Sequence, residues 1–141
     1  MSRKNLIAFS LVILVFAGCK KTTDNASKWV GTYTSSSGGG LGYNNFINQV
    51  QVEESNDFTL RLFLNNSSGT NVVTYTVLQN VVLQNATSGT ISESDSTNGL
   101  HSPAAYTGSV ALISGDTLKM ICAGVDSTGA TPISYNFYGV K

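Results

Sequence analysis

From Trp29 to the end of the chain, apolar and polar side chains alternate with a period of two. Between residues 58 and 64, for example, Phe58 and a leucine at every second position share one face of the segment. Such alternation is typical of a β-strand with one face on a core and the other in solvent. Outside the N-terminal region, no window has the i, i+3, i+4, i+7 spacing of an amphipathic helix. We therefore predict an all-β domain over residues 29–141.

Clusters of Ser, Asn, Asp and Gly separate the alternating segments, as expected for tight turns. They lie at residues 55–57, 65–69, 114–116 and 126–129. This pattern predicts eight or nine short strands in an antiparallel up-and-down meander, which either closes into a barrel or folds over as a β-sandwich. We favour a small closed barrel, because closure removes exposed strand edges and charged residues that would protect an edge are scarce here. The β-sandwich is the alternative.

The first predicted strand carries a recognisable motif. Its residues, Trp29-Val30-Gly31-Thr32-Tyr33, resemble the aromatic-x-Gly-Thr-aromatic start of the calycin group, which includes lipocalins and fatty-acid-binding proteins. The glycine follows the tryptophan rather than preceding it, so the motif matches the wider group better than true lipocalins. The resemblance implies a lipocalin-like barrel with the first-strand aromatic closing one end. With its leader, the chain resembles small lipocalin-like lipoproteins of the Bacteroidetes kind.

The N-terminal segment has the pattern of a secretory signal peptide. Arg3 and Lys4 precede an apolar run over residues 6–18, which is shorter than the ~20 residues that span a bilayer. The sequence Val15-Phe16-Ala17-Gly18-Cys19 resembles the lipobox of bacterial lipoproteins, although Phe16 stands where leucine is usual. That resemblance implies removal of residues 1–18 and acylation of Cys19. Ordinary secretion with cleavage after Ala17 is the alternative.

Between the predicted anchor and the predicted barrel, residues 19–28 form a lipidated cysteine followed by a polar, flexible tether. Loss of Arg3 and Lys4 with the leader leaves six basic and eight acidic residues, a net charge of −2. A domain with this charge is not attracted to anionic lipids, so the acyl chains would supply the membrane attachment. We therefore expect a monomeric lipoprotein of the bacterial cell envelope, in the outer membrane and facing the periplasm or the cell surface.

The composition excludes several kinds of function. Ser, Thr, Asn and Gly make up 60 of the 141 residues, and the basic and acidic residues cancel, so nucleic-acid binding is not expected. With one histidine, His101, and two cysteines, the chain offers too few ligands for a zinc site. No Gly-x-Ser-x-Gly motif surrounds a serine. The sequence thus predicts a protein that is not an enzyme and has no cofactor or metal.

Two further groups of residues allow specific interpretations. Cys122 alternates in phase with Leu118 and Met120, which predicts a buried structural thiol. Glu93 and Asp95 are two residues apart and share a strand face, a spacing compatible with calcium or glycoside chemistry. No third acidic residue is close in sequence, so we interpret this pair as the acidic edge of a hairpin.

Aromatic residues on the predicted inward faces suggest a pocket for a small apolar ligand. The expected lining residues are Tyr33, Phe46, Asn48, Tyr75, Tyr106, Tyr135 and Phe137, with Asn136 in or beside the lining. The same aromatics could instead fill the core of a structural or interaction lipoprotein. Such a protein would dock through an outer patch of Phe63, Ile121 and Tyr138. A glycan-binding β-sandwich module is a further alternative.

Overall fold

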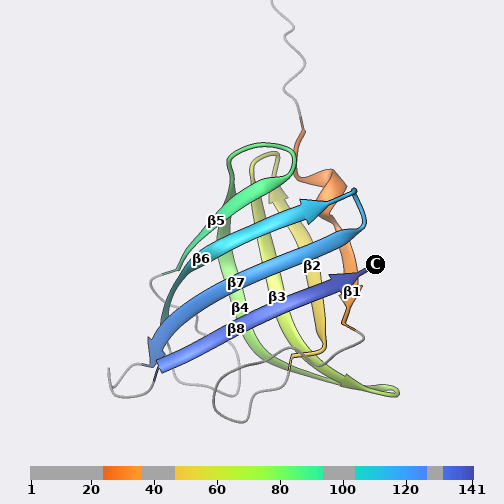
Figure 1. The fold of residues 1–141 in the computed structure, drawn as a ribbon, viewed down its shortest axis with the longest axis vertical. Helices are drawn as coiled ribbons and strands as arrows, with labels where there is room; N and C mark the ends of the chain where they lie inside the picture. Colours follow the sequence, from red (N-terminus) through yellow and green to blue (C-terminus); the bar gives the residue numbers. More distant parts are fainter. Residues whose placement is uncertain (1–23, 36–46, 94–103, 127–131) are drawn as a thin grey trace, which may run out of the picture.

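The structure, a computed structural model, describes residues 24–35, 47–93, 104–126 and 132–141. Eight strands follow one another as an antiparallel meander, and the last strand pairs with the first to close a barrel (Figure 1). This confirms the predicted all-β class and the barrel rather than the sandwich. Among the described residues, no helix is long and apolar enough to cross a membrane.

A single 3₁₀ turn precedes the strands. The elements are η1 (Ser27–Trp29), β1 (Gly31–Thr34), β2 (Gln49–Asn56), β3 (Thr59–Ser68), β4 (Asn71–Leu83), β5 (Ser88–Glu93), β6 (Ala104–Ile113), β7 (Thr117–Asp126) and β8 (Pro132–Val140). Because Ala26 is fully buried, the folded part of the chain extends to the N-terminal side of Trp29.

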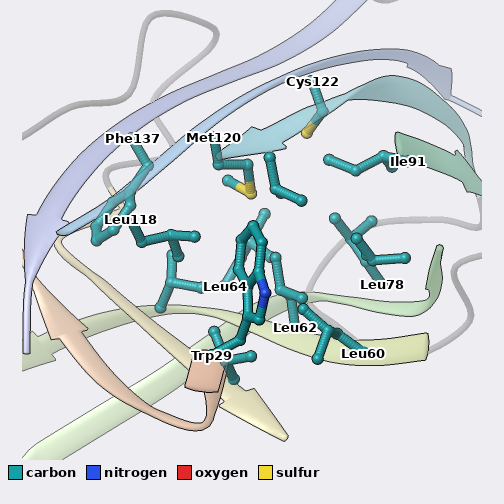
Figure 2. Close-up of a cluster of buried hydrophobic side chains, with 14 of the residues drawn as sticks. Trp29, Leu60, Leu62, Leu64, Leu78, Ile91, Leu118, Met120, Cys122 and Phe137 are labelled. Carbon is teal, nitrogen blue, oxygen red and sulfur yellow. The ribbon is translucent and has the colours of Figure 1, made fainter. Parts of the chain in front are cut away.

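The alternation of side chains produces one continuous core inside the barrel. On β7, for instance, Leu118, Met120 and Cys122 are buried, whereas Lys119 and Ile121 between them are exposed. Trp29 projects from η1 into this core, among leucines of β3 and opposite Met120 (Figure 2). Full burial of a leucine, phenylalanine or methionine side chain, such as those of this core, contributes about 1.5–3 kcal/mol to stability. The core is therefore the main source of stability.

The two ends of the barrel differ in what lies there. The plug end is formed by η1 together with the connections at residues 57–58, 84–87 and 114–116. In the three-residue β6–β7 connection, Ser114 and Gly115 both have positive φ, as the central residues of a type I′ turn do, and the Asp116 N–H group donates a 3.4 Å hydrogen bond to the carbonyl of Ile113. The opposite end, called the distal end below, is where β1, β3, β5 and β7 finish and the even-numbered strands begin.

A β-bulge in β4 reverses the predicted alternation of that strand. Leu60 pairs with Val81 but Leu62 pairs with Leu78, so β4 carries one extra residue between these two pairs. On the C-terminal side of the bulge, Val81 and Leu83 at odd-numbered positions are buried, whereas Thr76 and Leu78 at even-numbered positions are buried on its N-terminal side. Thr76 is consequently buried in the barrel, whereas Tyr75 is only half-buried at a second register shift. Tyr75, expected on the inward face together with Val73 and Val77, is thus not fully buried, although Val77 is.

Candidate ligand site inside the barrel

The plug end is closed by Trp29, which is held in place by the local structure around η1. The Asp24 Oδ1 atom accepts hydrogen bonds from the backbone N–H groups of Ala26 and Ser27, each at 3.0 Å. These bonds, that from Ser27 above all, lower the pKa of Asp24. The indole of Trp29 is fully buried, and its Nε1 atom has no hydrogen-bond partner among the described residues. Trp29, which lies in η1 immediately before β1, thus acts as an apolar plug.

Tyr33 belongs to the plug end as well. Its hydroxyl donates a 2.9 Å hydrogen bond to the carbonyl oxygen of Trp29. Lys141 covers the same ring, with Nζ 5.5 Å from the ring centroid and a 2.8 Å bond donated to the carbonyl of Lys28. Burial, with a smaller contribution from the charge of Asp116, raises the pKa of Tyr33 to about 12. The hydroxyl group of Tyr33 is therefore used within the fold.

A group of hydroxyls occupies the distal half of the barrel interior. The Thr76 and Tyr135 hydroxyls lie 3.1 Å apart and share a buried hydrogen bond between β4 and β8, which are opposite each other in the barrel. The rings of Tyr106 and Tyr135 are neighbours, with centroids 6.0 Å apart and planes inclined by 33°. Burial raises the pKa of Tyr135, and Tyr106 adds to this, whereas the bond to Thr76 opposes it. We call Thr76, Tyr106 and Tyr135 the hydroxyl cluster.

Tyr106 differs from the other two members of the hydroxyl cluster. Its side chain is fully buried, yet its hydroxyl has no hydrogen-bond partner among the described residues. Leaving a buried polar group unsatisfied costs about 1–3 kcal/mol. A buried, unpaired hydroxyl in a native core therefore calls for an explanation, such as a bound water or ligand.

A glycine opposite Tyr106 makes room for its ring. A Cβ atom added to Gly124 on β7 would lie 2.7 Å from Cδ1 of Tyr106 and would also clash with the backbone of Ala105. Gly108 on β6 likewise faces the backbone of β7 too closely for any side chain. Gly124 is the cross-strand partner of Tyr106, and Gly108 is the cross-strand partner of Cys122. The Tyr106 ring thus lies against the backbone of Gly124, and this contact fixes the position of the ring and its hydroxyl.

Glu93 holds the bulge that positions Thr76. Its Oε2 atom accepts hydrogen bonds from the backbone N–H groups of Gln79, at 2.7 Å, and Asn80, at 3.0 Å. These are the residues at the bulge, where β4 and β5 no longer pair through their backbones beyond Val81 and Ile91. The Glu93 carboxylate therefore replaces missing ladder bonds, and it is only 7% exposed. This role differs from the solvated hairpin edge expected from the sequence, and Asp95 lies outside the described residues.

Cys122 is buried and free, as predicted. Burial raises the pKa of its thiol to about 12, partly opposed by a hydrogen bond with the backbone of Tyr135. The side chain of Cys122 is therefore protonated and neutral at physiological pH, and a neutral thiol is a poor nucleophile and a poor metal ligand. It contributes to the site as a small apolar group.

The structure brings some of the predicted lining residues together and separates others. Tyr106 and Tyr135 are adjacent in the distal half. Phe137 is fully buried, and its ring folds over Gly139, toward the plug end. Asn48 is half-buried, and its amide pairs with the backbone of Ser67 through bonds of 2.6 and 2.7 Å, so it extends the β2–β3 ladder. Phe46 and Cys19 lie outside the described residues.

Among the residues of the site, Thr76 was not identified from the sequence, and Glu93 was identified but interpreted as a hairpin edge rather than as the residue that holds the bulge. The available signal was the polar pair Gln79-Asn80, which interrupts an otherwise apolar stretch from Val77 to Leu83. Asn136, in contrast, was expected in or beside the lining but is exposed on the outer face. Its neighbours Tyr135 and Phe137 both point inward, so strict alternation directs Asn136 outward.

The expected outer patch is only partly assembled. Ile121 and Tyr138 are 46% and 56% exposed and lie diagonally on the paired strands β7 and β8. Phe63 is half-buried on β3, which pairs with β2 and β4, so it does not join them.

One group of acidic residues has the composition of a metal site. The carboxylates of Asp24, Glu54 and Asp57 at the plug end have oxygen atoms within 4.8 Å of one another. Two of the three residues are exposed, and Asp24 already accepts two backbone hydrogen bonds. Exposed carboxylates of this kind commonly occur without a metal, so the group is no basis for a metal centre.

Comparison with known proteins adds no assignment. No protein-family model matches the chain, and neither curated proteins nor solved structures include a significant match. The functional interpretation therefore rests on the residues and on the geometry of the barrel.

Proposed function

We propose that this chain is a non-enzymatic lipoprotein of the bacterial cell envelope whose barrel binds one small, mainly apolar ligand in its distal half. The observation that carries the proposal is the Tyr106 hydroxyl, which is fully buried in an apolar core and unpaired among the described residues. A ligand with a hydrogen-bonding group would satisfy it. The apolar part of that ligand would then lie against the surrounding side chains.

The plug end limits where such a ligand can bind. Trp29, Leu60 and Leu118 are fully buried there and fill the interior (Figure 2). Eight-stranded barrels are just wide enough to be filled by side chains or to hold one small ligand. We therefore place the ligand next to the hydroxyl cluster rather than along the whole axis of the barrel.

The same residues favour binding over catalysis. The raised pKa values of Tyr135 and Cys122 keep both groups protonated at neutral pH. Neither group then serves as a general base or an activated nucleophile. The hydroxyls can still donate and accept hydrogen bonds, which is sufficient for recognition.

Native mass spectrometry tests the ligand proposal directly. The chain beginning at Lys20 contains the whole barrel and its plug, and it should retain a small molecule when purified without detergent. Added ligands should also change the emission of Trp29, the only tryptophan of the chain. A structural or docking lipoprotein with a filled core would show neither effect, and this result would overturn the proposal in favour of that alternative.

The membrane anchor is tested separately. The proposed acylation at Cys19 predicts that the full-length protein partitions into detergent and fractionates with the outer membrane. Cys19→Ser should release the protein from that fraction, whereas Cys122→Ser should leave its location unchanged because that thiol is buried. Membrane association of Cys19→Ser equal to that of the wild type would contradict the anchor.

A further inference from the structure

We infer that the barrel selects neutral ligands carrying a carbonyl or hydroxyl group, such as alcohols, esters and ketones, over carboxylates of the same size. This inference rests on the proposed function and specifies its ligand class. It follows from the distribution of charge around the barrel and from the hydrogen-bonding capacity of the hydroxyl cluster.

Basic residues are nearly absent from the barrel, and those present point away from its interior. Between Trp29 and Val140 the sequence contains only Arg61 and Lys119. Arg61 is partly exposed beside Glu53, with Nη1 3.8 Å from Oε2, and Lys119 is exposed on the outer face of β7. Lys28 and Lys141 flank the strands at the plug end. Among the described residues, a carboxylate bound near the hydroxyl cluster therefore has no cation to pair with.

The buried carboxyl group at the distal end adds to this effect. Glu93 is buried on the inward side of β5, where it accepts hydrogen bonds from the Gln79 and Asn80 amides of β4. A ligand anion would lose its hydration without gaining an opposite charge, which is strongly unfavourable in a barrel core.

The hydroxyl cluster has a free donor for a neutral acceptor. Each hydroxyl carries one hydrogen and can also accept. In the Thr76–Tyr135 pair one hydroxyl donates to the other, so the hydrogen of the accepting hydroxyl is not used within the pair. The three hydroxyls carry three hydrogens, and hydrogen bonds of Tyr135 with Thr76 and with the neighbouring Tyr106 would use at most two of them, so at least one donor remains available to a ligand carbonyl or hydroxyl oxygen. This arrangement suits a neutral oxygen, for which no cation is needed.

A matched set of ligands that share an eight-carbon chain tests the inference. Octan-1-ol, methyl octanoate and octanoate have the same chain length and differ in the head group. Their affinities for the chain beginning at Lys20 should be measured at neutral pH by Trp29 emission and by calorimetry. We expect at least one of the neutral ligands to bind roughly tenfold or more tightly than octanoate. Acidification that protonates octanoate should remove most of the difference while the barrel remains folded.

Two variants connect the result to the hydroxyl cluster. Tyr106→Phe removes only the hydroxyl and should weaken binding of the neutral ligands about five- to tenfold. Tyr138→Phe makes the same change on the outer face and should leave binding unchanged. Octanoate binding as tightly as the neutral ligands would overturn the inference while leaving the proposed function intact. Absence of binding by all three ligands would overturn the proposed function itself.

Discussion

The plug end and the distal end of the barrel are built from the same strands but differ in polarity. At the plug end, Trp29 packs among leucines and the Tyr33 hydroxyl is consumed by a backbone carbonyl. In the distal half, the inward face instead carries Thr76, Tyr106 and Tyr135. The interior therefore changes along its axis from wholly apolar packing to a layer that contains hydroxyls.

This difference assigns stability mainly to the plug end and the proposed ligand binding to the distal end. Apolar packing at the plug end stabilises the closed barrel, although the buried Nε1 atom of Trp29 lacks a hydrogen-bond partner among the described residues. The distal layer includes a buried hydroxyl that lowers stability unless something binds it. Proteins retain such unfavourable features mainly where function requires them. Substitutions at the two ends should therefore change different measured quantities.

The largest effect is expected at the plug. Trp29→Ala should lower the free energy of unfolding by about 3–5 kcal/mol, because it leaves a cavity in a fully buried site. Urea unfolding followed by circular dichroism measures this without the lost fluorophore. Trp29→Phe should fall between the wild type and the alanine variant, and Val30→Ala, at an exposed neighbour, should change little. A loss for Trp29→Ala no greater than that for Val30→Ala would mean that Trp29 is not a packing element.

The next effect concerns the bulge that shapes the distal half. Glu93→Gln should reduce the free energy of unfolding by about 1.5–3 kcal/mol, since neutral oxygen is a weaker acceptor for the Gln79 and Asn80 amides. Urea denaturation provides the value. Glu54→Gln, the same change at an exposed position on β2, is the matched control and should shift stability by no more than about 0.5 kcal/mol. Equal effects of the two substitutions would show that the carboxylate does not hold the bulge.

Alkaline pH probes the buried thiol of the core. The pKa of Cys122 is about 12 in the fold, against 9.0 for an ordinary thiol. Between these values the unfolded chain releases a proton that the folded chain keeps, so stability falls by about 1.4 kcal/mol per pH unit for this group. The contribution is fully present below pH 9 and is lost as pH rises through 12. Urea midpoints for Cys122→Ala should therefore decline less steeply over this range than those of the wild type, and parallel curves would refute the buried thiol.

The smallest change in stability should come from the hydroxyl that is most important for function. Tyr106→Phe removes an unpaired buried hydroxyl, so the free energy of unfolding without ligand should stay the same or rise by about 1 kcal/mol. Ligand binding should weaken at the same time. Tyr135→Phe offers a contrast, because it breaks the bond to Thr76 and should destabilise the protein by about 1 kcal/mol. A similar loss of stability in both variants would mean that Tyr106 already has a partner.

Where the strand register is regular, sequence alternation predicted which side chains point inward. Tyr106, Cys122, Tyr135 and Phe137 on β6 to β8 are buried as expected, because each neighbouring pair is in continuous register. The prediction failed where local hydrogen bonds interrupted the pattern. Phe58, expected inward, is 46% exposed in a turn, because the Asn56 side chain accepts a 3.0 Å bond from its N–H group.

The candidate site was harder to predict than the strands. Two of its three hydroxyls, Tyr106 and Tyr135, follow from alternation, but Thr76 required knowledge of the bulge in β4. That bulge depends on Glu93, which is 13 residues from Asn80 in the sequence. Alternation along one strand does not reveal an inserted residue when the side chain that stabilises the insertion belongs to another strand.

The sequence alone determined that the chain forms strands, that Tyr106, Tyr135 and Phe137 on the regularly paired strands point inward, and that almost no basic residue lies along the barrel. These properties are local or compositional, so they do not depend on how distant segments meet. Tertiary structure decided that the meander closes and that Thr76 meets Tyr135, 59 residues away. It also decided that the Tyr106 hydroxyl is left without a partner. Closure brings opposite strands within hydrogen-bonding reach only at one register, and that register is set by packing and bulges together.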